Sequence, residues 1–334
     1  MPPEPTGGTA SSAFARAEPR VRSAGITGLG SALPQRRVLN CEVGAPLGIE
    51  EGWIERRTGI NERRYAADGE RLSELAAAAA LAALRGAELD ADQLDLVLVA
   101  TITADEITPA AAPIVAHEIG ARNAAAIDVG AACAGSLSAL ALATSMIEAG
   151  RARHVLVVGA EILSRLIDYE DRLTAPLFGD GAGALVVSLE ASGQIGPFVL
   201  GSDGAAAGAI RATRARGVLE MEGHETFLLA VDRLVRCTRE VLELAEIPLA
   251  EVDLFVYHQA NSRILSAVAD RLGLERERVF DCLANLGNTS AASIPLALDE
   301  AVRRGVLRSG DRVLLGAVGA GLVWGSTVLT WSGS

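Results

Sequence analysis

The stretch A-I-D-V-G-A-A-C-A-G-S-L-S-A, residues 126–139, decides how the rest of the chain is interpreted. An apolar segment ends at a glycine-rich turn, Cys133 follows, and an alanine- and leucine-rich helical pattern continues from there. A thiol at a strand-to-helix corner meets the first free amides and the positive end of the helix dipole, and both favour the thiolate. We therefore predict that Cys133 is a nucleophile that becomes acylated.

The composition favours an α/β enzyme over a nucleic-acid-binding protein. The chain has 334 residues, of which 50% are hydrophobic and 4% aromatic, and its net charge is −12. This length allows one large α/β domain or two ordinary ones. The acidic balance disfavours a nucleic-acid partner for the chain as a whole. The chain contains no lysine, so every fixed positive side-chain charge is an arginine.

The cysteines and the N-terminal segment bear on the cellular setting. Cys41, Cys133, Cys237 and Cys282 show no C-x-x-C spacing, which argues against a metal site and against a disulfide framework. A reducing cytoplasm is therefore the expected location. Residues 1–20 lack the apolar core of a signal peptide, and their proline, glycine, serine and threonine content predicts a disordered tail.

One apolar run resembles a membrane span in length. Residues 129–147 contain no charged side chain, but they include two glycines, several serines and threonines, and many alanines. This low hydrophobicity favours a buried helix, and no membrane partner is predicted.

The pattern along the chain predicts strands alternating with helices. Gly28 and Gly30 lack a third glycine leading into a helix, so we interpret them as a turn and not as a dinucleotide fingerprint. The glycines after Phe178 lead into a strand and not a helix, which predicts a tight packing corner and not a phosphate loop. The expected segments are a strand and turn at 21–34, a helix at 72–84, strands at 93–100 and 153–159, and a turn into a strand at 178–187.

The second half repeats the order of the first. Residues 252–257 (V-D-L-F-V-Y) mirror 94–99 (L-D-L-V-L-V), and each strand leads through a helix to a glycine-marked corner, at Cys133 in one half and Asn288 in the other. We predict two duplicated α/β halves, 21–190 and 191–334, related by a pseudo-dyad that brings Cys133 close to the second-half loops.

Polar residues follow the predicted strands of the second half. His258 and Asn261 come directly after a strand, Asn288 lies at a helix entrance, and Gly319 and Gly321 precede the last strand. Each alone is typical of a structural role, as is a buried cysteine. Their convergence at the corners of a duplicated unit favours a catalytic site.

The motifs together resemble the β-ketoacyl-acyl-carrier-protein synthase III family, within the thiolase-like superfamily, over residues 21–331. They are A-C-A-G around Cys133, F-G-D-G-A-G-A from Phe178, H-Q-A-N-x-R from His258, G-N-T-S-A-A-S from Gly287, and W-G at Trp324. The resemblance implies a thiolase-like five-layer αβαβα fold and a homodimer.

The resemblance also implies the chemistry. Cys133 would attack an acyl-CoA, with the backbone N–H groups of Cys133 and Gly321 as the oxyanion hole. A malonyl thioester on acyl carrier protein would then lose CO2, and the enolate would be held by hydrogen-bond donors on His258 and Asn288. No metal and no bound cofactor are implied, and acyl-CoA is a substrate.

Residues 50–64 are rich in arginine, and on pattern alone a solvated helix end is favoured over a cationic mouth. The resemblance reverses this preference. It implies CoA-binding roles for Trp53 and Arg57 in W-I-x-x-R-T, for Arg172, and for Asn261 and Arg263 in H-Q-A-N-x-R.

The sequence departs from the family at several positions. Thr108 and Ser136 stand where common members of the family carry phenylalanine. In those members the phenylalanine at the position of Thr108 caps the acyl pocket of the neighbouring subunit. The smaller residues here predict a pocket wider than one built for acetyl. The segment 202–227, another pocket wall, is short. Two carrier-docking lysines correspond to Leu228 and Asp270, so Arg263 and Arg271 are what remains of the docking patch.

Four functions remain open at this point. The leading one starts fatty-acid or polyketide chains by decarboxylative condensation. The next passes the acyl group from Cys133 to a hydroxyl or amine without decarboxylation, and Asn288 counts modestly against it. A Cys-His-Asn hydrolase lacks a protease signature, and a non-catalytic partner subunit is disfavoured because Cys133, His258 and Asn288 are all present.

Overall fold

The computed structural model describes residues 23–189 and 191–332, so the predicted tail at 1–20 lies outside the described residues. The strands are β1 (Gly25–Ala32), β2 (Arg36–Leu39), β3 (Glu62–Tyr65), β4 (Leu96–Ala100), β5 (Ala125–Val129), β6 (His154–Glu161), β7 (Gly181–Ser188), β8 (Ile195–Ser202), β9 (Ile210–Ala212), β10 (Leu219–Met221), β11 (Leu254–Tyr257), β12 (Arg312–Gly319) and β13 (Val323–Thr330). The helices are α1 (Asn40–Gly44), α2 (Trp53–Thr58), α3 (Leu72–Gly86), α4 (Ala111–Glu118), α5 (Gly135–Glu148), α6 (Gly223–Leu244), α7 (Ser262–Leu272), α8 (Leu283–Leu286) and α9 (Ser293–Arg303).

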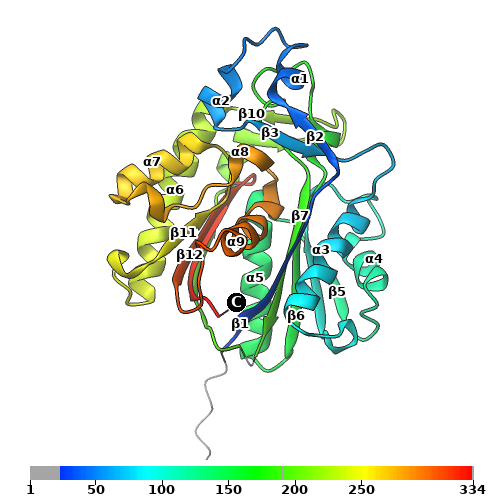
Figure 1. Ribbon diagram of the computed structural model, residues 1–334, viewed down its shortest axis with the longest axis vertical. Coiled ribbons are helices and arrows are strands. Elements are labelled where there is room, and N and C mark those ends of the chain that lie inside the picture. Colours follow the sequence, from blue (N-terminus) through cyan, green and yellow to red (C-terminus); the bar gives the residue numbers. More distant parts are fainter. Residues whose placement is uncertain (1–22, 190, 333–334) are drawn as a thin grey trace, which may run out of the picture.

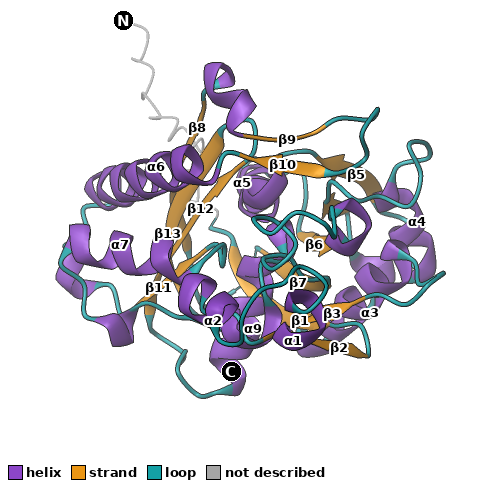
Figure 2. Ribbon diagram, turned by 90° about the horizontal axis from the view of Figure 1, so that it is seen from above, coloured by secondary structure: helices purple, strands orange, loops and turns teal. Residues whose placement is uncertain are grey.

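Two large sheets and three layers of helices build the described part of the chain, with two further two-stranded sheets, β2-β3 and β9-β10 (Figures 1 and 2). One sheet has the order β1-β7-β6-β4-β5 and the other has the order β11-β12-β13-β8. Helices α5 and α9 lie between the sheets, α3 and α4 cover the outer face of the first sheet, and α6 and α7 lie outside the second. The predicted five-layer αβαβα fold is confirmed.

The two sheets repeat one strand pattern. In the first sheet, β4 pairs with β6 in parallel, and β6 with β7 and β7 with β1 antiparallel. In the second, β11 pairs with β12 in parallel, and β12 with β13 and β13 with β8 antiparallel. Strand β7 ends at Ser188 and β8 begins at Ile195, and the division of the chain into halves at 190/191 remains a prediction.

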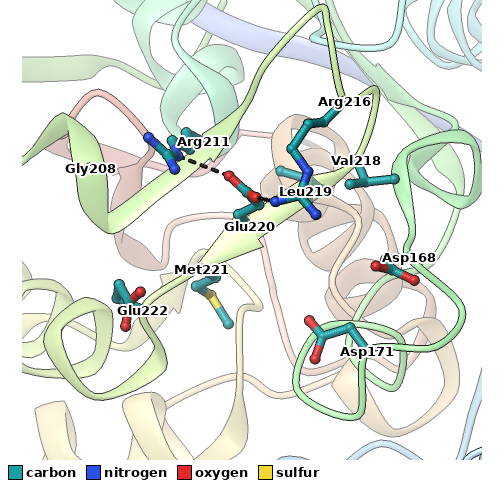
Figure 3. A pocket seen from close by; sticks show the side chains of 10 residues that line it. All are labelled: Asp168, Asp171, Gly208, Arg211, Arg216, Val218, Leu219, Glu220, Met221 and Glu222. Atoms are coloured by element: carbon teal, nitrogen blue, oxygen red, sulfur yellow. Dashed lines mark hydrogen bonds and ion pairs between the residues drawn. The ribbon is translucent and has the colours of Figure 1, made fainter.

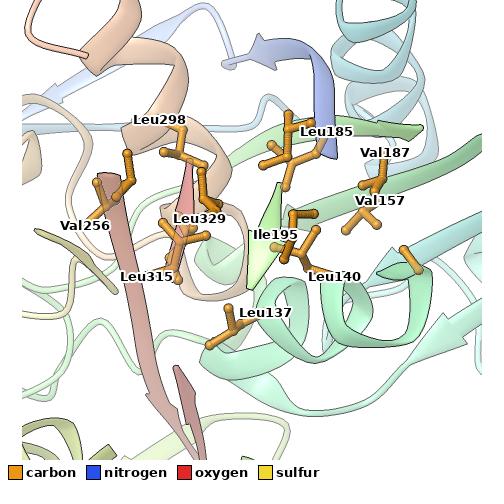
Figure 4. Packing of buried hydrophobic residues seen from close by; sticks show 14 of the residues in the cluster. Leu137, Leu140, Val157, Leu185, Val187, Ile195, Val256, Leu298, Leu315 and Leu329 are labelled. Carbon is orange, nitrogen blue, oxygen red and sulfur yellow. The ribbon is translucent and has the colours of Figure 1, made fainter. Parts of the chain in front are cut away.

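The core between the sheets explains the charge-free run around α5. Leu137 and Leu140 on α5 and Leu298 on α9 point into the space between the sheets (Figure 4). Burying each such side chain contributes roughly 1.5–3 kcal/mol of transfer free energy. Their neighbours from the strands are Val157, Leu185, Val187, Ile195, Val256, Leu315 and Leu329. Most of the apolar run is therefore helix α5, whose core-facing side is buried as predicted, and among the described residues no helix has the length and hydropathy needed to span a membrane.

The glycines near the start of the chain have a different role from the one predicted. Gly28 and Gly30 lie within β1 and not in a turn after it. A Cβ at Gly28 would lie 2.2 Å from the carbonyl oxygen of Ala83, and one at Gly30 would lie 2.3 Å from that of Ala79. These glycines let α3, with its stripe of alanines, pack directly on the strand.

Candidate active site

Cys133 lies at the corner between β5 and α5, as the sequence predicts, in a short 3-10 turn that spans Ala132–Ala134. The end of β12 packs directly against this turn, because a Cβ on Gly319 would lie 2.8 Å from the backbone nitrogen of Cys133. The first half therefore supplies the thiol, and the second half supplies the strand end that supports it.

The thiol faces a cavity of about 560 Å³. His258 and Asn288 line the same cavity, so the structure brings together the three residues predicted to carry the chemistry. His258 follows β11, and Asn288 lies in the loop between α8 and α9. The rest of the wall is mainly apolar, which suits an acyl chain.

The electrostatic state of Cys133 is opposite to the one expected from the sequence. Burial raises the pKa of its thiol to about 11, and the nearby carboxyl of Glu161 adds to this rise, while the side chain of Ser290 lowers it. The resting residue is therefore a thiol and not a thiolate. The amides at the start of α5 do not outweigh desolvation, so attack requires a group that accepts the proton.

His258 is neutral in this environment, because burial lowers its pKa to about 4. Its Nδ1 lies 2.6 Å from the hydroxyl oxygen of Ser293, at the start of α9. Its backbone N–H donates to the carbonyl of Gly316 in β12 at 2.8 Å. When the Ser293 hydroxyl donates to Nδ1, the ring proton is on Nε2, and His258 is a hydrogen-bond donor.

The orientation of Asn288 is set by its own loop. Its side-chain Oδ1 accepts a hydrogen bond of 2.9 Å from the backbone N–H of Ser290. The amide nitrogen, which only donates, is therefore the atom left for a ligand. The backbone of Asn288 is held by the corner at Phe178, since its N–H donates to the carbonyl of Leu177 and its carbonyl accepts from the N–H of Gly179.

That corner confirms the prediction for the glycine-rich segment after Phe178. A Cβ on Gly179 would lie 2.3 Å from the carbonyl oxygen of Leu286, so this segment is a close packing corner beneath the Asn288 loop. The carboxylate of Asp180 is buried there and accepts hydrogen bonds from the backbone of Ala66 and Ser164.

Gly321, the second predicted oxyanion-hole residue, lies in the turn between β12 and β13. Its φ of 144° is a conformation that residues with a Cβ rarely adopt. Its neighbours Ala320 and Leu322 line the cavity with Cys133. The participation of its N–H in an oxyanion hole remains a prediction.

The predicted CoA-binding residues gather around the same cavity. The guanidinium of Arg57 lies 5.1 Å from the ring centre of Trp53, both on α2. Asn261 caps α7 by accepting from the N–H of Arg263 at 2.9 Å. Arg172 lines the cavity from the loop between β6 and β7. Among the described residues, Arg57, Arg172 and Arg263 form no ion pair with an acidic side chain, so their charges are available to an anionic ligand.

One wall of the cavity is the hairpin of β9 and β10, within the segment 202–227. Leu219 and Met221 of β10 line the cavity and also border a second, smaller hollow (Figure 3). In that hollow Glu220 accepts a hydrogen bond of 2.9 Å from Arg211 and also pairs with Arg216. The hairpin thus separates the apolar cavity from a charged surface.

Three predicted residues lie away from the cavity wall of the single chain. Thr108 is exposed, and Ser136 is 2% exposed with a buried hydroxyl that has no partner among the described residues. Arg271 lies in the last turn of α7. Ser136 was predicted to widen the acyl pocket, but its side chain is buried away from the residues that line the cavity. The predicted roles of Thr108 in a partner's pocket and of Arg271 in carrier docking concern a second molecule and remain predictions.

The structure adds three residues that the sequence analysis did not single out: Glu161, Ser290 and Ser293. One signal was available for the first of them. A glutamate closes the otherwise apolar strand H-V-L-V-V-G-A-E at 154–161, where a buried charge is costly.

These observations define a condensing-type acyltransferase site of the thiolase-like fold, with thiol, imidazole and carboxamide in one cavity. Family models agree, because residues 127–204 match 3-oxoacyl-[acyl-carrier-protein] synthase III and residues 242–331 match its C-terminal part. The chain belongs to the β-ketoacyl-[acyl-carrier-protein] synthase III family.

Individual relatives are similar over nearly their whole length. The chain is 45% identical to β-ketoacyl-[acyl-carrier-protein] synthase III 3 of Streptomyces coelicolor, over 93% of this chain and 98% of the relative. Among solved structures, 3-oxoacyl-[acyl-carrier-protein] synthase III of Aquifex aeolicus has a TM-score of 0.90 at 41% identity, covering 92% of this chain and 100% of that one. The priming β-ketosynthase of the R1128 polyketide pathway has a TM-score of 0.90 at 39% identity, covering 95% and 98%.

Proposed function

We propose that this enzyme takes an acyl group from acyl-CoA onto Cys133 and condenses it with malonyl-acyl carrier protein, with loss of CO2, to start a fatty-acid or polyketide chain. The observation that carries this proposal is the orientation of Asn288 beside His258 in the cavity of Cys133. Both side chains present donors, which suit a developing enolate and do not suit removal of a proton from an alcohol or amine.

The first half-reaction uses the mouth of the cavity. Arg57, Arg172 and Arg263 carry charges that can meet the phosphates of CoA, and Trp53 offers an aromatic face beside them. The apolar wall, including Leu219 and Met221, receives the acyl chain. The tetrahedral oxyanion is held by the N–H groups of Cys133 and Gly321.

The second half-reaction uses the donors of the second half of the chain. The malonyl carbonyl accepts from Nε2 of His258 and from the side-chain nitrogen of Asn288, which stabilises the enolate as CO2 leaves. The carbanion attacks the acyl group on Cys133, and the sulfur leaves as thiolate. The site residues themselves supply this chemistry without calling for a resident metal or redox cofactor.

The acceptor is proposed to arrive on acyl carrier protein. Arg263 at the cavity mouth and Arg271 in the last turn of the same helix, α7, are exposed cations on a surface that an acidic carrier can meet. Leu228 and Asp270 leave this surface less basic than in common relatives. A reducing cytoplasm suits the four cysteines, all of which are free.

A homodimer completes the proposal. Strand β5 forms one edge of its sheet, and Ile127 on this strand is 53% exposed. Leu142 and Met146 on α5 and Ile107 in the loop before α4 are exposed large apolar side chains from the same half. An edge strand beside exposed apolar side chains is a surface that a second copy can cover. The position of Thr108 in this loop is consistent with its reaching the partner's acyl pocket.

Intact-mass spectrometry tests the proposal. Wild-type protein is incubated with a series of acyl-CoAs, with Cys133→Ala as control, and malonyl-acyl carrier protein is then added. We expect an acyl adduct that requires Cys133, followed by CO2 release and a β-ketoacyl product. An adduct that transfers only to hydroxyl or amine acceptors would replace condensation with the acyltransferase alternative, and no adduct with any donor would overturn both.

A further inference from the structure

A buried carboxyl lies behind the nucleophile. Glu161, the last residue of β6, is 0% exposed and is bonded to the loop that carries Asn288. Its Oε1 accepts a hydrogen bond of 3.0 Å from the hydroxyl of Ser290. Ser290 also lines the cavity with Cys133, and its side chain lowers the pKa of the Cys133 thiol.

Several neutral donors hold this carboxyl in place. The backbone N–H of Ile102 donates to Oε2 at 3.1 Å, the hydroxyl of Thr103 donates at 2.6 Å, and that of Thr101 donates at 3.2 Å. No arginine is among the hydrogen-bond or ion-pair partners of Glu161 in the described part of the chain. A buried acid without a cation is costly, and these structural contacts could be made by a neutral amide, so a carboxyl here indicates a functional requirement.

The backbone brings Glu161 and Ser290 together closely. A Cβ on Gly159, two residues before Glu161, would lie 2.2 Å from the carbonyl oxygen of Ala291. Ser290 itself has a φ of 46°, a conformation uncommon for a residue with a side chain. The turn is thus held in a strained geometry in which one residue orients Asn288 through its N–H and contacts Glu161 through its hydroxyl.

We propose that Glu161 is a positioning residue that receives, through the hydroxyl of Ser290, the proton that Cys133 loses when it attacks the acyl thioester. The inference rests on the proposed function, because that function requires a deprotonated sulfur at this position.

The proton moves through two groups as the sulfur attacks. The S–H bond of Cys133 breaks, its proton passes to Ser290 Oγ, and Ser290 gives its own proton to Oε1 of Glu161. The sulfur forms a bond to the acyl carbon, and the bond from that carbon to the CoA sulfur breaks. The departing CoA thiolate then takes the proton back along the same two groups, so one thiol replaces another and Glu161 ends as a carboxylate.

The alternative acceptor within the cavity is His258, and it is the weaker one. Burial lowers the pKa of His258 to about 4 and raises that of Glu161 to about 7. A carboxyl with the higher pKa takes up a proton from a thiol more readily than an imidazole that resists charging.

The hydrogen-bond partners of Glu161 are not titratable groups. From the segment after β4 it meets Thr101, Ile102 and Thr103, and from the turn before α9 it meets Ser290, none of which is titratable. Cys133 is the titratable group facing it from the turn before α5. Across the β6–β7 pairing Glu161 lies opposite Gly181. The neighbouring carboxylate of Asp180 accepts hydrogen bonds from Ala66 and Ser164.

The first test separates the two half-reactions in Glu161→Gln, with Glu148→Gln on the exposed end of α5 as control. The amide introduced by this substitution keeps an oxygen for the Ile102 and Thr103 donors and can donate to Ser290, but it does not accept the proton. We expect acylation from acyl-CoA to fall about 100-fold at pH 7.5, with condensation by pre-acylated enzyme within about threefold of wild type. Equal losses in both steps, or acylation as fast as in wild type, would overturn the proposal.

The second test uses double variants. Ser290→Ala interrupts the proton path between Cys133 and Glu161. The double variant Ser290→Ala with Glu161→Gln should acylate no more slowly than either single variant, because each of these changes breaks the same proton path. Additive losses would mean that the two residues act separately and would contradict the relay. Thermal unfolding of each variant, with a midpoint within a few degrees of wild type, identifies the proteins that qualify for comparison.

A third measurement needs no acyl substrate. Alkylation of Cys133 by iodoacetamide is followed against pH by mass analysis of its peptide, because Cys41 is also a free and exposed thiol. In wild type we expect an inflection near pH 7, where Glu161 becomes ionised, and its loss in Glu161→Gln, with the two rates converging as pH approaches 11. Identical profiles would sink the inference. Failure of acyl-CoA to acylate the wild type would count against the proposed function alone, because alkylation reports the thiol directly.

Discussion

The Nδ1 atom of His258 lies 2.6 Å from the hydroxyl oxygen of Ser293, and both groups are buried. This contact joins the strand end that carries the imidazole to the first residue of α9. It therefore sets which ring nitrogen faces the cavity and which one carries the proton.

Ser293→Ala removes this contact, so neither the tautomer nor the orientation of the His258 ring is fixed by it. A hydrogen bond of this kind contributes about 1 kcal/mol, so we expect condensation to slow by roughly fivefold, with acylation within about twofold of wild type. Rapid-quench measurement of the two half-reactions checks this. Ser326→Ala is the matched control, because Ser326 is also buried and donates to the backbone carbonyl of Cys237 away from the cavity. An equal effect of both variants would contradict a specific role for Ser293.

Asn288→Asp keeps the shape of the side chain and replaces the donor nitrogen by an acceptor oxygen. A negative charge opposite a developing enolate destabilises it, so we expect condensation to fall by about 100-fold or more. The Cys133 adduct should still form, and intact mass together with CO2 release separates the steps. Asn285→Asp, at an exposed position of α8 just before this loop, is the control. Unchanged decarboxylation in Asn288→Asp would mean that the amide does not hold the enolate.

The pH dependence of stability reports the state of Glu161. Its pKa is about 7 in the folded protein against 4.5 when free, so its favourable contribution is complete below pH 4.5 and is lost as pH rises through 7. Glu161→Gln lacks this titration. The free energy of unfolding of the variant should therefore rise relative to wild type by up to about 3 kcal/mol between pH 4.5 and about pH 8.

Urea unfolding at several pH values measures this difference. The contribution of His258 to stability depends on pH in the opposite direction, because its pKa is lowered from 6.5 to about 4. That contribution is present above pH 6.5 and is lost as pH falls from 6.5 to about 4. That term is common to both proteins and cancels in the comparison. A difference that stays constant over the whole range would show that Glu161 does not titrate in it.

Gly319→Ala tests the contact beneath the nucleophile. The added methyl group would lie 2.8 Å from the nitrogen of Cys133 and 2.9 Å from the carbonyl oxygen of Ala131, so the turn must shift. We expect about 1–3 kcal/mol of destabilisation. Acylation should be about tenfold slower or more, since small displacements at a reacting centre are costly.

Gly204→Ala is the matched control for this change, because a Cβ at Gly204 meets no atom within 4 Å. Urea unfolding and the acylation rate are measured for both variants. A normal acylation rate in Gly319→Ala would show that the position of the turn does not limit attack.

Thr108→Phe tests the width of the acyl pocket in the proposed homodimer. The ring should narrow the pocket of the partner, so acylation by a long-chain acyl-CoA should fall about tenfold or more relative to acetyl-CoA. Thr108→Ser is the control, and competition between two acyl-CoAs read by intact mass gives the ratio. An unchanged ratio in a protein shown by light scattering to be a dimer would remove Thr108 from the pocket.

Local pattern was enough to predict the elements and to place the three predicted catalytic residues in one site. The helix at 72–84 and the strands at 93–100 and 153–159 appear as α3, β4 and β6, because apolar periodicity and β-branching reflect burial directly. The duplication and the motifs also placed Cys133, His258 and Asn288 at loop corners that meet in one cavity.

Local pattern could not predict features that depend on contacts between segments far apart in the chain. The local pattern predicts a turn at Gly28 and Gly30, and only the packing of α3 against β1 explains them as strand residues. Whether a glycine permits a turn or a close approach is decided by a partner far along the chain. No local signal distinguishes the two.

The sequence by itself predicted that Cys133 lies at a strand-to-helix corner and that an imidazole and an amide share its site. Only the tertiary structure decided its protonation state, because burial outweighs the helix amides and raises the pKa of the thiol to about 11. The carboxyl of Glu161 and the hydroxyl of Ser290, 129 residues apart in the chain, meet behind it at 3.0 Å. Desolvation and the approach of distant side chains arise only from packing, so they are properties of the folded chain and not of any segment of it.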